Sequence, residues 1–125
     1  MDLLEGRVLG VLENPDGEVS GSTTFHFHEQ DSVVSANYAG GAVRLGYLVG
    51  TRDGTQLRFR YVHLSADGEL SSGISDDRIE VLADGRVRLY EKWRWESKDG
   101  SGESILEEVR DPDRRIHASG ISGAS

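Results

Sequence analysis

Glu91 is the residue of this sequence whose position points most clearly to chemistry. It lies between Leu89 and Trp93 in a segment of alternating apolar and polar residues, and it shares their side of that segment. An ionised carboxylate on the apolar face of a sheet costs several kcal/mol unless it is paired. Burial also raises the pKa of a carboxyl group, so that Glu91 could serve as a general acid or base near neutral pH.

The same alternation predicts the neighbours of Glu91. We expect His63 to lie near it, as its acid–base partner if the protein is an enzyme, and we expect Glu107 to lie beside it where the last strand closes the sheet. The residues expected to contact a ligand are Tyr38, Phe59, Tyr61, Trp93, Trp95 and Glu107. Such a set suits the binding of a small aromatic or carbonyl compound, or proton transfer on it. A structural role is the alternative, in which a buried glutamate bonded to a Tyr or Trp donor closes one end of a barrel.

Two histidines, His26 and His28, lie two residues apart, a spacing that metal sites use. Their phase places them with Ser22 and Thr24 on the solvent side of their segment, so we expect no metal there. The sequence contains no cysteine, which excludes disulfides and zinc–thiolate sites. It also has no Gly-rich phosphate loop and no G-x-S-x-G motif, and we therefore expect no cofactor.

Asp-Gly pairs, the strongest short hairpin signal, divide the chain. They occur at residues 16–17, 53–54, 67–68, 84–85 and 99–100. Between them lie segments rich in Val, Ile, Tyr, Phe, Trp and Thr with a period of two. Strands are expected near residues 7–13, 18–28, 32–38, 42–51, 56–65, 69–82, 86–97 and 103–110. In the long sixth segment, Gly73 and the neighbours Asp76 and Asp77 predict a bulge or a break.

The expected fold is an all-β, up-and-down antiparallel β-barrel of about eight strands. Short connections join neighbouring strands and leave no room for the crossover that parallel strands need. Closure removes the two free edges of an open sheet, and a two-sheet sandwich is the alternative. We expect a single domain over residues 1–110 and a flexible C-terminal tail over residues 111–125, whose composition is that of a linker.

The alternation also predicts which side chains point into the barrel. On the fourth strand these are Val43, Leu45, Tyr47 and Val49. Of the aromatic residues (two Trp, four Tyr and three Phe), only Tyr90 is expected to point outward. An eight-stranded barrel is just wide enough to be filled by side chains or to hold one small ligand, and the pattern does not decide between the two.

Acidic residues outnumber basic ones, 22 Asp and Glu against 14 Lys and Arg, for a net charge of -8. Such a surface repels phosphate backbones and anionic headgroups, so we expect neither a nucleic acid nor a membrane as a partner. The first residues lack the pattern of a signal peptide and no segment reaches membrane-spanning length, which predicts a cytoplasmic protein. The sequence does not decide whether the protein forms a homodimer.

Three stretches, GGAVRLGYLVG at residues 40–50, YVH at 61–63 and DGRVRLYEKWRWESKDGSGESILEEV at 84–109, resemble a family of small bacterial proteins of about this length. The resemblance covers residues 6–109, and members of that family are often labelled N-acetylglutamate synthase. Acetyltransferases of that name use an α/β fold with a Gly-rich loop, and this chain has neither the helical pattern nor the loop. In architecture the chain is similar to the calycins, ligand-binding barrels of the lipocalin and avidin type, although no G-x-W motif opens its first strand.

Three functions are compatible with these residues. The leading one is a barrel that binds a small apolar or aromatic ligand in its interior. The alternative is a cofactor-free isomerase, cyclase or lyase in which Glu91 and His63 are the acid–base pair. The third is a packed barrel without a pocket that acts through its surface.

Overall fold

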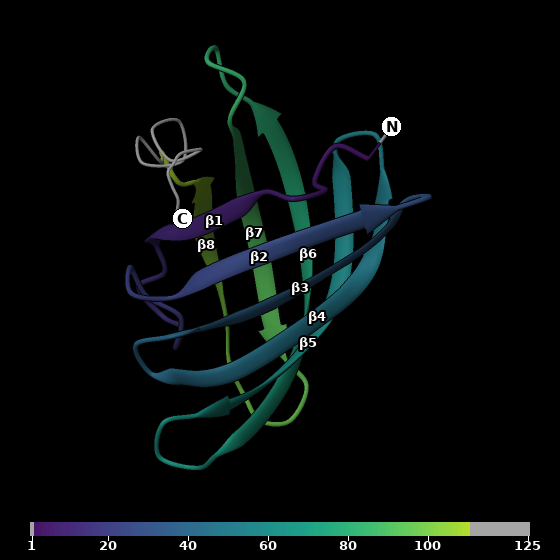
Figure 1. Cartoon of the computed structure of the whole chain (residues 1–125). Helices are drawn as coiled ribbons and strands as arrows, with labels where there is room; N and C mark the ends of the chain where they lie inside the picture. Colours follow the sequence, from purple (N-terminus) through teal and green to yellow (C-terminus); the bar gives the residue numbers. More distant parts are fainter. Residues whose placement is uncertain (1, 111–125) are drawn as a thin grey trace.

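A computed structural model describes residues 2–110, and in it eight antiparallel β-strands form one closed barrel (Figure 1). The strands are β1 (Val8–Glu13), β2 (Thr24–Gln30), β3 (Val33–Gly40), β4 (Val43–Asp53), β5 (Gln56–Ser65), β6 (Leu70–Val81), β7 (Val87–Trp95) and β8 (Ser101–Glu108). Each strand pairs with the next in the chain, and β1 pairs with β8 to close the sheet. The expected up-and-down barrel is confirmed, and the sandwich is excluded. The predicted flexible tail, residues 111–125, lies outside the described residues.

Asp-Gly turns connect three of the hairpins, as the sequence predicts. Gly54, Gly68 and Gly85 have φ angles of 62°, 95° and 89°, in the left-handed region that glycine enters without steric cost. They join β4 to β5, β5 to β6, and β6 to β7. Short turns of this kind keep the strands in sequential order, so the connections of the barrel fall alternately at its two ends.

The second strand is shorter than predicted. β2 begins at Thr24 rather than near residue 18, and residues 14–23 form an irregular connection, the β1–β2 loop. Thr23 fixes the end of this loop, because its hydroxyl accepts a hydrogen bond from the Ser20 amide at 3.1 Å and donates one to the Gly40 carbonyl at 2.9 Å. The loop lies across one end of the barrel, where it covers the cavity described below.

The sixth strand contains neither the bulge nor the break predicted for it, and that expectation is wrong. β6 pairs with both β5 and β7 without a shift in register. Gly73 fits within the regular strand because the ring of Tyr61 occupies the space beside it: a Cβ at Gly73 would lie 2.4 Å from the Tyr61 hydroxyl oxygen. Asp77 fits because its side chain points into the barrel, where it finds a polar partner.

The fourth strand keeps its predicted inward phase only at Val43. An irregularity in its pairing with β5, just after Val43, reverses the alternation. The residues that become exposed as a result are Leu45, Tyr47 and Val49. Gly46 takes an inner position instead. The ring of Tyr38 fills the space beside it, so that a Cβ at this position would lie 2.4 Å from that ring. Tyr47 therefore joins Tyr90 as an aromatic residue on the outer face, which corrects the expectation that Tyr90 is alone there.

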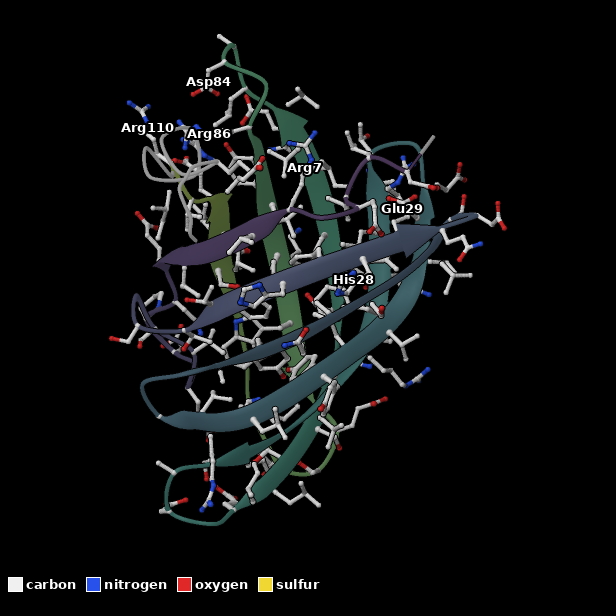
Figure 2. All side chains as sticks on the ribbon, in the orientation of Figure 1. Arg7, His28, Glu29, Asp84, Arg86 and Arg110 are labelled. Carbon is white, nitrogen blue, oxygen red and sulfur yellow. The ribbon has the colours of Figure 1, made fainter. Side chains whose placement is uncertain are left out.

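The barrel end next to the N-terminal segment is closed by a buried ion pair. The carboxylate of Glu29 accepts a hydrogen bond from the Leu4 amide at 3.0 Å and pairs with Arg52 at 2.8 Å. Arg7 and Arg86 lie at the same end (Figure 2) and are themselves paired with acidic side chains. The opposite end, covered by the β1–β2 loop, contains the candidate site.

Candidate functional site

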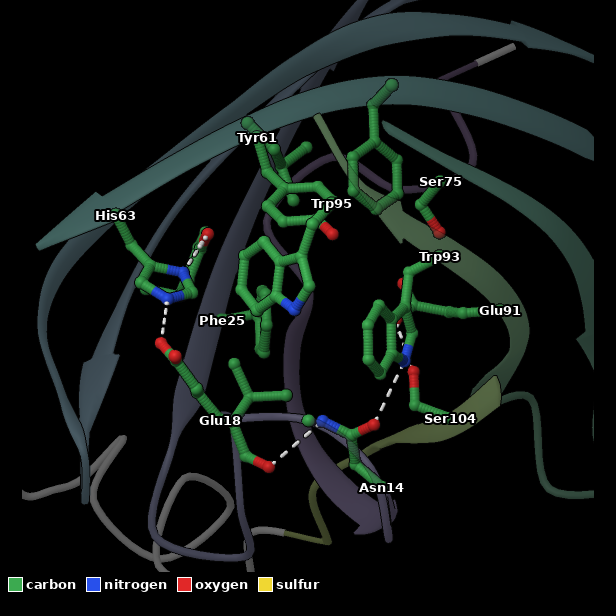
Figure 3. A pocket seen from close by; sticks show the side chains of 15 residues that line it. Asn14, Glu18, Phe25, Tyr61, His63, Ser75, Glu91, Trp93, Trp95 and Ser104 are labelled. Atoms are coloured by element: carbon green, nitrogen blue, oxygen red, sulfur yellow. Dashed lines mark hydrogen bonds and ion pairs between the residues drawn. The ribbon is translucent and has the colours of Figure 1, made fainter. Parts of the chain in front are cut away.

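A cavity of about 40 Å³ lies at the barrel end that the β1–β2 loop covers (Figure 3). Its aromatic lining consists of Phe25, Tyr38, Phe59, Tyr61, Trp93 and Trp95. Its polar lining consists of Asn14, Glu18, His63, Ser75, Glu91 and Ser104. A space of this size holds a few water molecules, whereas pockets for drug-sized ligands begin at about 300 Å³. The barrel therefore has an interior cavity, and the cavity is small.

Both tryptophans of the chain belong to the aromatic wall. Trp93 and Trp95 occupy successive inner positions of β7, with ring centroids 5.7 Å apart and ring planes at 62°. The Trp95 ring also meets Tyr61 at 5.7 Å and His63 at 5.6 Å, in both cases edge-to-face. Edge-to-face contact is a favoured geometry of aromatic pairs, so these rings hold one another in place around the cavity.

His63 is buried between two partners. The Tyr38 hydroxyl oxygen lies 3.0 Å from Nδ1 of His63, and a carboxylate oxygen of Glu18 lies 2.8 Å from Nε2. Burial raises the pKa of Tyr38, so its hydroxyl keeps its proton and can donate it to Nδ1. In that arrangement Nε2 carries the ring proton and donates it to Glu18. Both ring nitrogens are occupied while the loop is in place.

Glu18 attaches the β1–β2 loop to the barrel. Its Oε2 accepts a hydrogen bond from Nζ of Lys98 at 2.9 Å, while its Oε1 faces His63. Partial burial raises the pKa of Glu18, but the hydrogen bonds and charges of Lys98 and His63 outweigh this effect and lower the pKa below its usual value. Lys98 in turn lies over the ring of Trp95, 4.6 Å from its centroid. An ionised carboxylate is therefore held at the edge of the aromatic wall.

A pair of carboxyl groups lies deeper in the barrel. Asp77 and Glu91 are opposite each other in the register of β6 and β7, and they are 2% and 7% exposed. The Ser75 hydroxyl donates to Asp77 at 2.5 Å and the Ser104 hydroxyl donates to Glu91 at 2.8 Å. Among the described residues, Oδ2 of Asp77 and Oε2 of Glu91 have no donor. Burial raises the pKa of both groups, and the charge of Glu91 raises that of Asp77 further, so Asp77 keeps a proton that it can donate to Glu91.

The structure brings most of the predicted site residues to one cavity. Those that line it are Tyr38, Phe59, Tyr61, His63, Glu91, Trp93 and Trp95. His63 and Glu91 lie on different sides of the cavity (Figure 3) and bond to different partners, so acid–base pairing between them stays a prediction. The expectation that Glu107 lies beside Glu91 is wrong. Ser104 is opposite Glu91 in the register, and Glu107 instead pairs with Arg86 at 2.8 Å.

Asn14 and Glu18 line the cavity and Asp77 lies opposite Glu91 in the register, but none of the three was predicted as a site residue. The sequence did carry a signal that Asp77 points inward, because in the period-two alternation of β6 it falls on the same face as Ser75, which is buried. Asn14 accepts a hydrogen bond from the indole nitrogen of Trp93 at 3.0 Å. Neither Asn14 nor Glu18 carries a pattern that would reveal such contacts, because both belong to an irregular loop.

The two histidines with metal-like spacing, His26 and His28, are exposed on the outer face of β2. Within residues 2–110 no group of three or more His, Asp or Glu side chains is placed to hold a metal ion. The same part of the chain has no helix with the length and apolarity needed to cross a membrane.

A closed barrel of eight antiparallel strands with a covered cavity at one end defines the chain as a calycin-like β-barrel protein. The sequence matches the model of one family, described as avidin-like protein, over residues 2–109. The chain belongs to this avidin-like family, and the expected likeness to calycins of the avidin type is confirmed. A comparison with curated proteins gives no match.

Proposed function

We propose that this avidin-like barrel binds one small apolar or aromatic molecule in its interior. The observation that carries the proposal is the convergence of Tyr61, Trp93 and Trp95 on one covered cavity. Ligand sites are typically concave and largely apolar, with a few polar groups that fix the orientation of the ligand. Here the rings supply the apolar wall, while His63 and Glu91 supply polar groups on two sides.

A ligand of ordinary size fits only if the cover moves, because the cavity of about 40 Å³ is too small for it. The β1–β2 loop is the part of the cover without regular secondary structure. Its side chains reach the barrel interior through the bonds of Glu18 to His63 and of Asn14 to Trp93. Segments held by few contacts open at the lowest free energy, so we expect this loop to act as the entrance.

The two indole N–H groups give a direct test, because the chain has two tryptophans and both line the cavity. A library of small cyclic compounds is titrated into isotopically labelled protein, and the two indole resonances are followed by NMR. We expect some compounds to shift these resonances in a saturable manner. Trp95→Leu removes part of the wall and should weaken their binding about tenfold or more.

Tyr47→Leu is the matched control for Trp95→Leu, because it removes an aromatic ring that is exposed on the outer face of β4. This variant should bind the same compounds as tightly as the unmodified protein. A library that shifts neither indole resonance would overturn the proposal, and so would compounds whose affinity is the same in both variants.

A catalytic role is the second candidate, and the buried carboxyl pair is the observation that favours it. Glu91 lines the cavity and has a proton-bearing neighbour in Asp77, and a general acid–base must hold an exchangeable proton within reach of the substrate. His63 could contribute once the loop has opened and freed Nε2. Hydrogen–deuterium exchange at a carbon atom of a bound carbonyl compound, lost in Glu91→Gln, would demonstrate catalysis. Binding without exchange would leave the barrel a binding protein.

A further inference from the structure

The β1–β2 loop places a carboxylate of its own at the mouth of the cavity. Oε1 of Glu18 lies 2.8 Å from Nε2 of His63, and Oε2 lies 2.9 Å from Nζ of Lys98. Each carboxylate oxygen has its own donor, which is a two-point arrangement well suited to recognising a carboxylate. The side chain of His63 is 2% exposed, so this donor is built into the barrel wall rather than the surface.

The two donors adjoin the aromatic wall. Nζ of Lys98 lies 4.6 Å from the ring centroid of Trp95, and the His63 ring meets the same indole edge-to-face at 5.6 Å. Tyr61 packs against both His63 and Trp95. A molecule whose carboxylate took the position of the Glu18 carboxylate would therefore place its apolar part against these rings.

The two donors at the mouth favour an anionic acceptor over a neutral or cationic ligand. When the loop opens, Glu18 leaves both donors, and a buried donor such as His63 is costly to leave without an acceptor. A neutral ligand offers a weaker acceptor, and an ammonium ligand would face the positive charge of Lys98. Two other acids are near: Glu69 lies 3.2 Å from Lys98, and Glu91 lies on the opposite side of the cavity, where Ser104 is its donor.

The geometry points to an aromatic carboxylate as the ligand of this barrel, with its carboxylate replacing that of Glu18 on His63 and Lys98. This inference rests on the proposed function and deepens it by naming the chemical class of the ligand. Glu18 then acts as an internal competitor, which satisfies the two donors while the cavity is empty and gives way to an incoming acid. Exchange of one carboxylate for another keeps the charge of the site constant, so no proton transfer is needed.

Three probes of nearly the same shape test the ligand class: benzoate, benzamide and benzylamine. Each is titrated into the labelled protein, and the shifts of the two indole resonances give its dissociation constant. We expect benzoate to bind about tenfold more tightly than benzamide, and benzylamine to bind most weakly, because an ionised acceptor makes the stronger hydrogen bond. In Glu18→Gln the affinity for benzoate should rise several-fold, because the charged competitor is gone.

The two lysines of the chain provide a matched pair of variants. Lys98→Gln removes the ammonium group at the mouth and should abolish the preference for benzoate over benzamide. Lys92→Gln makes the same change of charge at an exposed position of β7 and should preserve that preference.

The outcomes separate this inference from the proposed function. Benzamide or benzylamine that binds as tightly as benzoate would overturn the inference and leave the proposed function intact, as would a preference for benzoate that survives Lys98→Gln. Benzoate that fails to bind, while other compounds of the library shift the indole resonances, would also overturn it. If no compound of any class shifts these resonances, the proposed function itself fails.

Discussion

Replacing Asp77 with asparagine should remove the part of the pH dependence of stability that the proton on Asp77 creates. Burial and the charge of Glu91 raise the pKa of Asp77 well above its usual value of 3.8 in the folded barrel. The folded protein therefore retains a proton that the unfolded chain releases once the pH exceeds that usual value. Linkage then requires the free energy of unfolding to fall as the pH rises, by about 1.4 kcal/mol per pH unit for one proton, until the pH passes the raised pKa.

Asp77→Asn should lose this slope and keep the fold. The amide oxygen can still accept the hydrogen bond of Ser75, and the amide nitrogen can donate to Oε2 of Glu91, which has no other donor among the described residues. Relative to the unmodified protein, the variant should therefore gain about 1.4 kcal/mol in unfolding free energy for each pH unit within the window.

Urea unfolding followed by tryptophan fluorescence, repeated between about pH 5 and pH 8, measures this difference. Asp76→Asn is the matched control, because Asp76 is the preceding residue of β6 but its exposed side chain pairs with Arg58. Its profile should run parallel to that of the unmodified protein. If the profile of Asp77→Asn also ran parallel to that of the unmodified protein, Asp77 would not retain a proton in the folded barrel.

Three further predictions concern the site and the closed end of the barrel. Glu91→Gln should keep the fold, because the amide is isosteric, and should weaken the binding of compounds that shift the indole resonances. Thermal melts measure the stability of the variant and titrations measure its binding. If binding is unchanged and the Tm is lowered, Glu91 has a structural role alone. Trp93→Phe removes the hydrogen bond to Asn14 but keeps a ring, so the free energy of unfolding should fall by about 0.5–1.5 kcal/mol. The amides of the β1–β2 loop should then exchange faster with deuterium, and equal exchange rates would argue against a loop held by this bond. Arg52→Ala leaves the buried carboxylate of Glu29 without its ion partner and should lower the unfolding free energy by about 3–5 kcal/mol; a loss below about 1 kcal/mol in urea unfolding would contradict a buried pair.

The order and pairing of the strands were predictable because they depend on local signals. Asp-Gly pairs at the turns and alternation between them specify short hairpins, and hairpins in series form a meander. The inward face of β4 could not be predicted from alternation, because one irregularity beside Val43 moves every later side chain to the other face. Gly46 and Gly50 were the signal for the true phase, since neighbouring residues fill the space that a side chain there would need.

The aromatic wall of the site was predictable from the period-two pattern of β5 and β7, and the polar groups were only partly so. The contact between Glu18 and His63 joins residues 45 positions apart through a loop with no periodicity, so it exists only once the barrel has closed. The position of Glu107 could not be predicted either, because its distance from Glu91 depends on the register of β7 and β8 rather than on the face of either strand.

Native mass spectrometry of the full chain, equilibrated with a small-molecule extract of the cells that produce it, tests most directly whether the barrel interior is a binding site. We predict one bound molecule per barrel, released when the protein unfolds. Trp95→Leu should lose this molecule, and Tyr47→Leu should retain it. A barrel that stays empty in the extract, or a molecule that both variants retain equally, would contradict binding in the interior.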